Sequence, residues 1–577
     1  MTESSRKSGT ICSAFFTILS VYLATNSPAK SQGLGPPPVA SLVDENGFDF
    51  MTGAMSISID DLKIGLAQTE DSTKPRAAIS FSRQIVENGW RHNYQLTVQQ
   101  GGLLVNLGSH GKTLTASGSS PTKTGEMLSL TGSIYTYTYP DGTIIHFDKY
   151  FNVYYPALDE TQGLATEVIF PSGEKLSFAY KMTTVSGVLF ARLQSVSSSY
   201  GYLLKYEYYT DSAPTSLNNM SWLAISKVSA INLAIDSCNP SSDHCTGLTR
   251  TWPNVTYTQT GPNQEVDTDP TGAATRYTWD TSIGNYVNIR PADSTVDTVV
   301  VGADDVYATF ITRNGVKFRY GAGYCGGVLC QRVVGPNGFF RGVVTKSSTA
   351  LGNPEVIEDW DSNGNKTTFE YDDFDRKTKI IQPEGNYVKY SYDDRGNVTE
   401  TRFVAKPGSG VADIVTTAAF PLTCTNPLTC NRPTSATDAN NNTTTYTYDA
   451  AHGGLLTKTG PAVNGIQPVV RYSWAQRYAW VSNGAGGYVH GSAPIWILAN
   501  TRTCRTTTTV GNACAGGATD EIVTTYDYGP DSGPNNLLLG GIVVTADGTS
   551  LRTCLGYDAI GNQIWSTSPR AGLVSCS

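Results

Sequence analysis

The stretch of sequence that decides the fold is residues 359–399, which read DWDSNGNKTTFEYDDFDRKTKIIQPEGNYVKYSYDDRGNVT. In this stretch a glycine is twice followed seven positions later by a tyrosine, from Gly364 to Tyr371 and from Gly385 to Tyr392. An aspartate comes directly after each tyrosine. Glycine, aromatic and acidic residues that return at a fixed spacing predict a repeated structural unit.

The residues between each glycine and tyrosine predict a β-strand. Successive side chains of a strand point to opposite faces of the sheet. After Gly385, one face therefore carries Asn386, Val388, Tyr390 and Tyr392. The opposite face is more polar, and a sheet with one packed face is typical of antiparallel hairpins.

The aspartate that follows the tyrosine predicts a turn. Its carboxylate can accept hydrogen bonds from the backbone that follows, and a nearby glycine supplies a positive φ without steric cost. The positions that define the repeat are Gly364, Tyr371, Asp372, Gly385, Tyr392, Asp393, Gly396, Tyr448, Asp449, Tyr557, Asp558 and Gly561. One hairpin cannot bury its aromatic face alone, so we expect successive units to stack.

Two short motifs recur in register along the second half of the chain. Residues 359–399 contain Y-D-x-x-G-N and P-x-G-x6-Y, and residues 435–449 (SATDANNNTTTYTYD) and 556–562 (GYDAIGN) continue the pattern. With these motifs the sequence resembles the Rhs/YD-repeat family. Residues 40–345 carry only degenerate copies, such as the one that runs from glycine to tryptophan over 272–279.

The resemblance implies both a fold and a role. Members of the family wind an antiparallel β-strip into a hollow shell, which in bacterial polymorphic-toxin systems encloses a C-terminal toxin. We therefore expect an all-β protein, a long antiparallel β-strip of stacked YD-type hairpins wound into an open or partial shell, like a cocoon or solenoid. Such a shell would scaffold, enclose or deliver a C-terminal effector and would not be an enzyme.

The family's self-cleaving core segment contains a D-P-x-G element, which is echoed at Asp269-Pro270-Thr271-Gly272. That element lies in the middle of this chain and directly precedes a predicted strand, so we interpret it as an ordinary repeat turn. A new unit opens at Tyr557-Asp558 shortly before the last residue. We therefore expect a truncated shell, whose partners would be missing downstream repeats or an effector domain.

The N-terminus resembles a secretory signal. Residues 1–31 contain two cations at 6–7, an apolar run over 11–24 and small residues at 29–31. The apolar run is too short for a permanent membrane span, and no later stretch is suited to one. We expect a secreted, cell-surface or periplasmic protein. The expected organisation is a signal peptide (1–31), an N-terminal segment leading into the repeats (32–90), degenerate repeats (91–345) and clear repeats that end within a unit (346–577).

The cysteines support export. One of them, Cys12, lies in the signal, and an even number in an exported chain favours disulfides. The other ten fall into neighbours along the chain, without CxxC spacing, so zinc is not expected, although the sequence leaves the connectivity open. The candidate disulfide cysteines are Cys238 and Cys245, Cys325 and Cys330, Cys424 and Cys430, Cys504 and Cys514, and Cys554 and Cys576.

The composition excludes several classes of protein. The net charge is −8, charged residues make up 16%, and the chain contains 57 glycines and 32 tyrosines. This aromatic, weakly charged composition argues against disorder, and its acidic balance argues against broad nucleic-acid binding. An excess of Tyr, Thr and Gly favours strands and turns.

The sequence offers no coherent catalytic constellation. It lacks HExxH and G-x-S-x-G motifs, and we predict no cofactor and no resident metal. Residues 106–113 superficially resemble a P-loop but have Asn where the first glycine is required, so we expect a hairpin loop there. Calcium at Asp393 and Asp394 would need further oxygens from other turns.

A cluster of aromatic residues leaves a second function open. They alternate in RYSWAQRYAW, residues 471–480, and a tryptophan follows nearby. These rings either line the packed face or stack on sugar rings of cell-surface glycans, which would make the protein a cell-surface adhesin or glycan-binding repeat protein. The residues are Tyr472, Trp474, Tyr478, Trp480 and Trp496.

Overall fold

The chain folds as an all-β protein in a computed structural model. The structure describes residues 42–51, 56–65, 78–86, 89–108, 111–155, 158–216, 220–280, 286–302, 309–348, 351 and 354–576. The predicted signal peptide lies outside these residues. No helix in the described part of the chain is long and apolar enough to cross a membrane.

One antiparallel sheet runs through most of the chain. From β7 to β33 each strand pairs with the next in sequence, and the ladder then continues through β36, β39, β40, β41 and β42. A short branch, β4 to β6, joins the ladder at β10, while β1 to β3 form a separate sheet. A short parallel contact between β9 and β12 links four successive strands locally. The first ten strands are β1 (Ile57–Gly65), β2 (Ala78–Val86), β3 (Gly89–His92), β4 (Leu96–Gln99), β5 (Leu104–Leu107), β6 (Gly111–Thr113), β7 (Met127–Thr131), β8 (Ile134–Thr138), β9 (Ile144–Tyr155) and β10 (Leu158–Ile169).

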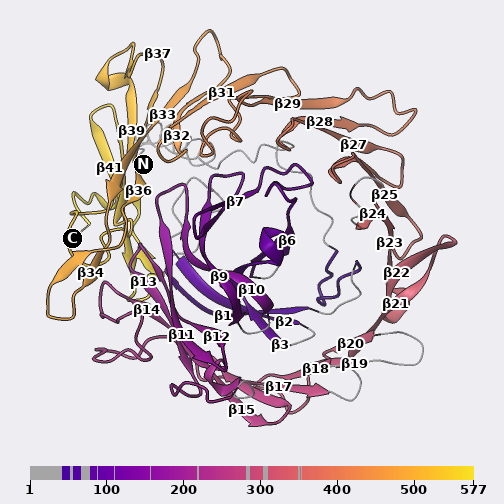
Figure 1. Cartoon of the computed structure of the whole chain (residues 1–577). Coiled ribbons are helices and arrows are strands. Elements are labelled where there is room, and N and C mark those ends of the chain that lie inside the picture. The colour runs from indigo at the N-terminus through magenta and orange to yellow at the C-terminus, as the bar shows by residue number, and fades with distance from the viewer. Residues whose placement is uncertain are drawn as a thin grey trace, which may run out of the picture.

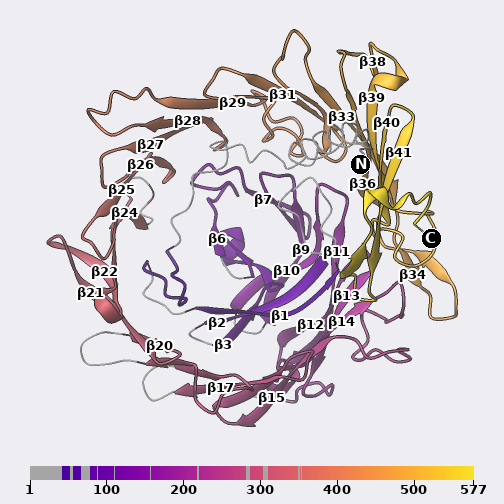
Figure 2. The same cartoon turned by 180° about the vertical axis from the view of Figure 1, so that it is seen from behind.

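The strands from β11 onward form the wall of a ring, and β1 to β10 lie inside it (Figures 1 and 2). The wall begins with β11 (Lys175–Val185), β12 (Val188–Ser198), β13 (Tyr202–Tyr208), β14 (Ile225–Asn232), β15 (Asn254–Gly261), β16 (Gln264–Thr268), β17 (Ala274–Asp280), β18 (Tyr286–Arg290), β19 (Val299–Gly302), β20 (Thr309–Arg313), β21 (Val316–Cys325), β22 (Val328–Val334), β23 (Phe340–Ser347) and β24 (Pro354–Trp360).

The clear repeats supply the rest of the wall. Its strands are β25 (Lys366–Tyr371), β26 (Lys377–Ile381), β27 (Tyr387–Tyr392), β28 (Val398–Val404), β29 (Ile414–Ala419), β30 (Ser435–Thr437), β31 (Thr443–Tyr448), β32 (Leu455–Thr459), β33 (Val469–Arg477), β36 (Ile495–Cys504), β39 (Glu521–Asp527), β40 (Gly541–Ala546), β41 (Thr549–Tyr557) and β42 (Gln563–Ser566). Two separate hairpins are inserted between these strands, β34 (Trp480–Ser482) with β35 (Tyr488–His490), and β37 (Thr509–Val510) with β38 (Ala513–Cys514). Short 3-10 helices are η1 (Gln100–Gly102), η2 (Met220–Trp222), η3 (Pro336–Gly338), η4 (Ala518–Asp520) and η5 (Pro569–Ala571).

The two ends of the wall meet through turns. The last repeat turn contacts wall strand β14, where Asn232 Nδ2 donates to the carbonyl of Ala559 at 2.9 Å, and it also contacts the inner strand β1, where the N–H of Gly65 donates to the carbonyl of Ile560 at 2.8 Å. The β34–β35 hairpin approaches the end of β14, where the N–H of Ser482 donates to the carbonyl of Leu233 at 2.7 Å. The sheet is therefore a wound β-strip, which confirms the expected open or partial shell. Strands near its two ends contact each other through turns, and among the described residues they do not pair as neighbouring strands.

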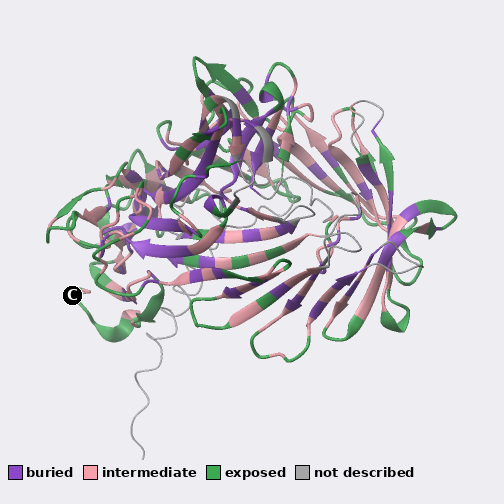
Figure 3. Ribbon diagram, turned by 60° about the horizontal axis from the view of Figure 1, so that its bottom comes forward, coloured by how far each residue is buried: buried purple, intermediate pink, exposed green. Residues whose placement is uncertain are grey.

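Two apolar clusters hold the inner strands against the wall. The larger joins β1, β2 and β4 to β9 to the wall strands β11 to β15, with Phe81, Phe147 and Tyr206 completely buried. The second packs the N-terminal residues Phe48 and Phe50 against β17 to β28. Buried positions follow the strands, whereas the hairpin loops are exposed (Figure 3).

The repeat strands bury one face, as the spacing predicts. Phe369, Ile380 and Tyr390 are each 7% exposed and belong to the second apolar cluster. The echo of the core segment, 269–272, forms a tight turn between β16 and β17, and the described residues on either side of 109–110 pair as the strands β5 and β6, with Asn106 opposite Gly111. Both agree with the interpretation from sequence.

Candidate functional site

The repeat turn is closed by an aspartate and an asparagine. Asp393 Oδ1 accepts hydrogen bonds from the backbone N–H groups of Arg395 and Asn397, both at 2.9 Å, and its Oδ2 accepts one from Asn397 Nδ2 at 2.8 Å. The same three-bond arrangement forms at Asp361, Asp438 and Asp558. These donors occupy each carboxylate within its own turn.

Electrostatics and backbone conformation support the same turn. Hydrogen bonds from Asn365 hold the pKa of Asp361 below its usual value. A left-handed residue closes each turn, with φ values of 78° at Gly364 and 83° at Gly396. Asn441 takes this conformation at φ 62°, because a short amide side chain tolerates it.

The hydroxyl of each repeat tyrosine reaches across its hairpin to the backbone of the preceding strand. The hydroxyls of Tyr371, Tyr392 and Tyr448 each donate to a backbone carbonyl 15 residues earlier, at 2.7, 2.5 and 2.9 Å. Burial raises the pKa of all three hydroxyls. Sequence reasoning placed these rings on the packed face but missed the hydrogen bond. The fixed spacing of the tyrosine from the preceding strand was the signal that could have revealed it.

The ten cysteines form disulfides between sequence neighbours, separated by 5 to 22 residues. The pairs are Cys238–Cys245, Cys325–Cys330, Cys424–Cys430, Cys504–Cys514 and Cys554–Cys576.

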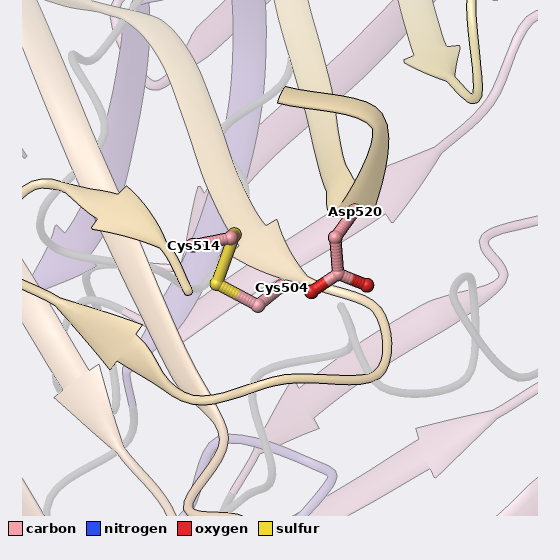
Figure 4. A group of neighbouring side chains, drawn as sticks. All are labelled: Cys504, Cys514 and Asp520. Carbon is pink, nitrogen blue, oxygen red and sulfur yellow. A yellow bond between two sulfur atoms is a disulfide. The ribbon is translucent and has the colours of Figure 1, made fainter. Parts of the chain in front are cut away.

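One group of neighbouring side chains resembles a metal site only in composition. Cys504, Cys514 and Asp520 place their ligand atoms within 4.8 Å of one another, but the two sulfurs are bonded to each other (Figure 4). The Asp520 carboxylate accepts hydrogen bonds from the backbone N–H and hydroxyl of both Thr506 and Thr507. These bonds lower the pKa of Asp520 to about 2. Because both sulfurs are in the disulfide, neither is a thiolate that could bind a metal ion. The cluster is therefore a turn closed by a disulfide.

A buried ionic clasp joins the inner sheet to the wall. Arg83 of β2 pairs with Asp61 of its own sheet and with Glu265 and Asp267 of wall strand β16, and all four side chains are 5–7% exposed. Glu265 lies 3.3 Å from the guanidinium. Tyr257 of β15 donates from its hydroxyl to Asp61 Oδ2 at 3.0 Å. Segments far apart in sequence are thus fixed together.

The guanidinium is also held between aromatic rings. Its carbon lies 4.0 Å from the ring centroids of both Trp90 and Tyr257. One cation faces three buried carboxylates, and burial raises the pKa of Asp267 to about 8, against the opposing charge of Arg83. Such a clasp is expensive to break, because each remaining charge would be left buried without its partner.

A cavity of about 250 Å³ lies beside the clasp, between β2–β3 and β12–β16. Its lining includes Arg83, Trp90, His92 and Arg192. Burial, with the nearby charge of Arg83, lowers the pKa of His92 to about 3, and its Nδ1 accepts a hydrogen bond from the N–H of Tyr94 at 3.3 Å. The Arg192 guanidinium donates to the carbonyls of Thr210 and Trp222. His92 and Arg192 are therefore engaged by polar groups of the protein itself, whereas Trp90 Nε1 and Arg91 Nε of the same lining are buried without a hydrogen-bond partner among the described residues.

The family model described as RHS Repeat matches residues 431–462. The match includes the turn at Asp438 and the tyrosine–aspartate pair at 448–449, whose geometry is that of the other units. Residues 431–462 therefore carry an RHS repeat.

The chain is also similar to solved structures of much longer proteins. It shows 11% identity and a TM-score of 0.30 to the crystal structure of TcdB2-TccC3, over 85% of this chain and 28% of that one. It shows 12% identity and a TM-score of 0.31 to a Photorhabdus luminescens Tc holotoxin pore, over 85% of this chain and 27% of that one. The chain thus spans little more than a quarter of their length. The search of curated proteins found no match.

The aromatic cluster predicted from residues 471–480 and Trp496 divides into two parts. Trp474 and Trp496 pack against the buried His452, with ring centroids 5.0 and 4.6 Å away. Tyr478 instead stacks on His490 of the β34–β35 hairpin at 4.8 Å, and Trp480 meets the same imidazole edge-on at 4.3 Å. Tyr478 is exposed, at 37%, whereas Tyr472, Trp474, Trp480 and Trp496 are half-buried.

Proposed function

We propose that the protein is an exported structural shell segment that scaffolds, encloses or delivers a C-terminal effector of a polymorphic-toxin system. The observation that carries the proposal is the winding of one β-ladder around an interior (Figures 1 and 2). A hydrogen-bonded wall satisfies its own backbone and separates an interior from solvent. The five disulfides support an oxidising, extracytoplasmic location, reached through the signal at 1–31.

The terminal strand of the ladder supports continuation of the shell. Among the described strands, β42 pairs with β41 alone. Its side chains Ile564 and Trp565 are 61% and 48% exposed. An edge strand presents backbone donors and acceptors that can pair with another strand. We propose that further YD units, in the same polypeptide or in a separate one, add to this edge and complete the enclosure.

Two steps test this role. The first is to sequence the DNA that flanks the coding region, where we expect further YD units and an effector-like domain. The second is to co-express the encoded segments and treat the purified assembly with protease. The effector should be cleaved at least about tenfold more slowly than the free effector, because the wall excludes protease. Flanking DNA without such units, or equal cleavage rates, would contradict the proposal.

A second candidate function is glycan binding through the β34–β35 hairpin. The observation in its favour is the surface group of Tyr478, Trp480, Tyr488 and His490, in which Tyr488 is 42% exposed. Aromatic faces at a surface suit the stacking of sugar rings. Binding on a glycan array that is lost in Tyr478→Ala and Tyr488→Ala variants would support an adhesin. An array without signal would count against it.

A further inference from the structure

The cavity beside the ionic clasp is reachable from solvent. Its deeper lining is buried and comes from both layers of the molecule, with His92 of β3 on the inner sheet and Tyr208 of β13 on the wall. Three further lining residues, Tyr209, Ala224 and Gln259, are exposed. The volume of about 250 Å³ far exceeds the ~15 Å³ that one water molecule needs. It lies just below the usual range for ligand pockets, about 300–1,000 Å³, so it suits a small ligand.

Two N–H groups in the lining lack a partner among the described residues. They are Trp90 Nε1 and Arg91 Nε, and both atoms are buried. A buried donor without a partner is uncommon in native proteins and points to a water molecule, an ion or a ligand that accepts its hydrogen bond. Both residues belong to β3, which pairs only with β2 among the described strands. The two donors therefore stand at the edge of the inner sheet, beside the cavity.

Arg91 is the cation of this lining that remains for a ligand. The guanidinium of Arg83 is occupied by the acidic side chains of the clasp, and that of Arg192 is paired with two aspartates. Arg91 forms no ion pair with a described residue. Glu265, the acidic residue of the lining, is held by Arg83 and by Gln259 Nε2, the latter at 2.8 Å. An anion in the cavity would thus meet one unpaired guanidinium and no unpaired carboxylate of the lining.

The rest of the lining offers mainly apolar surface. The hydroxyl of Tyr208 donates to the carbonyl of Leu193 at 2.6 Å, and the hydroxyl of Tyr257 donates to the clasp. Because these hydroxyls are occupied, the two tyrosines present their rings to a ligand. Leu223 and Ile225 add aliphatic side chains. Apolar walls with a few fixed polar groups are typical of sites that bind small organic molecules.

We propose that this cavity binds a small organic carboxylate, with its carboxylate on Arg91 and its apolar body against the aromatic and aliphatic lining. An arginine donates two parallel hydrogen bonds to a carboxylate, and Trp90 Nε1 supplies a further donor. A carboxylate suits the site better than a doubly charged phosphate, because one unpaired guanidinium balances one negative charge. Such a ligand bridges the inner sheet and the wall, and its binding does not depend on effector delivery.

Titration of the purified, oxidised protein with benzoate tests the proposal, with benzamide as an uncharged probe of the same shape. Isothermal titration calorimetry should give a dissociation constant of about 1 mM or lower for benzoate. The constant for benzamide should be at least about tenfold higher, because hydrogen bonds to a charged acceptor are about twice as strong as neutral ones. Benzoate at about 10 mM should also raise the thermal unfolding midpoint, since it binds the folded state. Equal affinities for the two probes, or no binding of benzoate, would overturn the proposal.

Matched variants locate the binding site. Arg91→Gln should weaken benzoate binding at least about tenfold and Trp90→Phe about fivefold, because they remove the cation and the indole N–H. The controls, Arg505→Gln and Trp565→Phe, make the same changes outside the cavity, at side chains that are 39% and 48% exposed, and should leave the affinity unchanged.

The unfolding midpoint of Arg91→Gln without benzoate should match that of the parent, because Arg91 has no ion pair with a described residue to lose. A loss of binding in this variant then reports on the site and not on the fold. Undiminished affinity in Arg91→Gln, or an equal loss in the controls, would overturn the proposal.

Discussion

Two strands of the same ladder show how differently its regions are packed. In β12 nearly every residue from Phe190 to Val196 is buried, while β31, over 443–448, contains no fully buried residue. The difference comes from what covers them. Inner strands cover one face of β12, and loops cover the other, where Ser195 and Lys205 both donate to the carbonyl of Pro240.

This contrast explains where the repeat can be read in the sequence. A strand that is covered on one face keeps a regular alternation of apolar and polar side chains. Its turn residues also recur at a fixed spacing, as in residues 359–399. In a strand that is covered on both faces, the second face must also fit the residues packed against it. The residue types at its positions are therefore set by these individual contacts and not by the repeat. Strands β12 and β13 of the degenerate region are accordingly buried along most of their length.

The largest expected effect is loss of the clasp in the inner region. Arg83→Met should lower the free energy of unfolding by about 3–5 kcal/mol, because it leaves a buried cluster of acidic side chains without its cation. The matched change in the repeat region, Arg505→Met, removes an ion pair with Asp547 that is largely exposed and should cost at most about 1 kcal/mol. Denaturant titration measures both values. Equal losses would contradict the contrast between the two regions.

The stability of the repeat region should depend more on its disulfide bonds than on buried ion pairs. Replacing Cys554 and Cys576 together with Ser should cost about 3 kcal/mol, since the disulfide closes a 22-residue separation, whereas the 5-residue separation at Cys325 and Cys330 predicts about 2 kcal/mol. Thermal unfolding of the two double variants gives the comparison. The intact mass of the parent should rise by about 10 Da on reduction, and an unchanged mass would refute the staples.

Acid should destabilise the inner region through His92. Its pKa is lowered to about 3 in the folded protein, against 6.5 in the unfolded chain, so only the unfolded chain gains this proton as the pH falls below 6.5. The stability that His92 contributes is present above pH 6.5 and is lost toward pH 3, by about 2 kcal/mol between pH 6.5 and pH 5. His92→Gln should flatten this dependence in denaturant titrations. A variant with an unchanged pH profile would exclude His92 as the source.

The smallest expected effect concerns the tyrosine hydroxyl of the repeat. Tyr392→Phe removes the hydrogen bond to the carbonyl of Lys377 and should cost about 1 kcal/mol in the free energy of unfolding. Tyr387→Phe on the same strand removes a hydroxyl to which no such bond is assigned, and it should stay within about 0.5 kcal/mol of the parent. Identical values for the two variants would mean that the hydroxyl bond adds nothing to the repeat.

Much of the repeat could be predicted from sequence because its determinants are local. The Asp393 turn and its glycine lie within four residues of one another. The clasp could not be predicted, because Arg83 and Glu265 are 182 positions apart and nothing near either residue indicates the other. The ladder also passes from β33 directly to β36, and that jump depends on how the inserted β34–β35 hairpin packs.

Sequence alone could predict the all-β class, the hairpin unit and its turn chemistry, because strand alternation and turn hydrogen bonds act over a few residues. The tertiary structure alone decided how the strip winds, which strands lie inside it and where its ends meet. Those features depend on contacts such as that between Gly65 and Ile560, whose free energy is realised only once the whole ladder has formed. Local sequence patterns specify the hairpin unit, whereas burial between residues far apart in the sequence specifies how the hairpins wind into a shell.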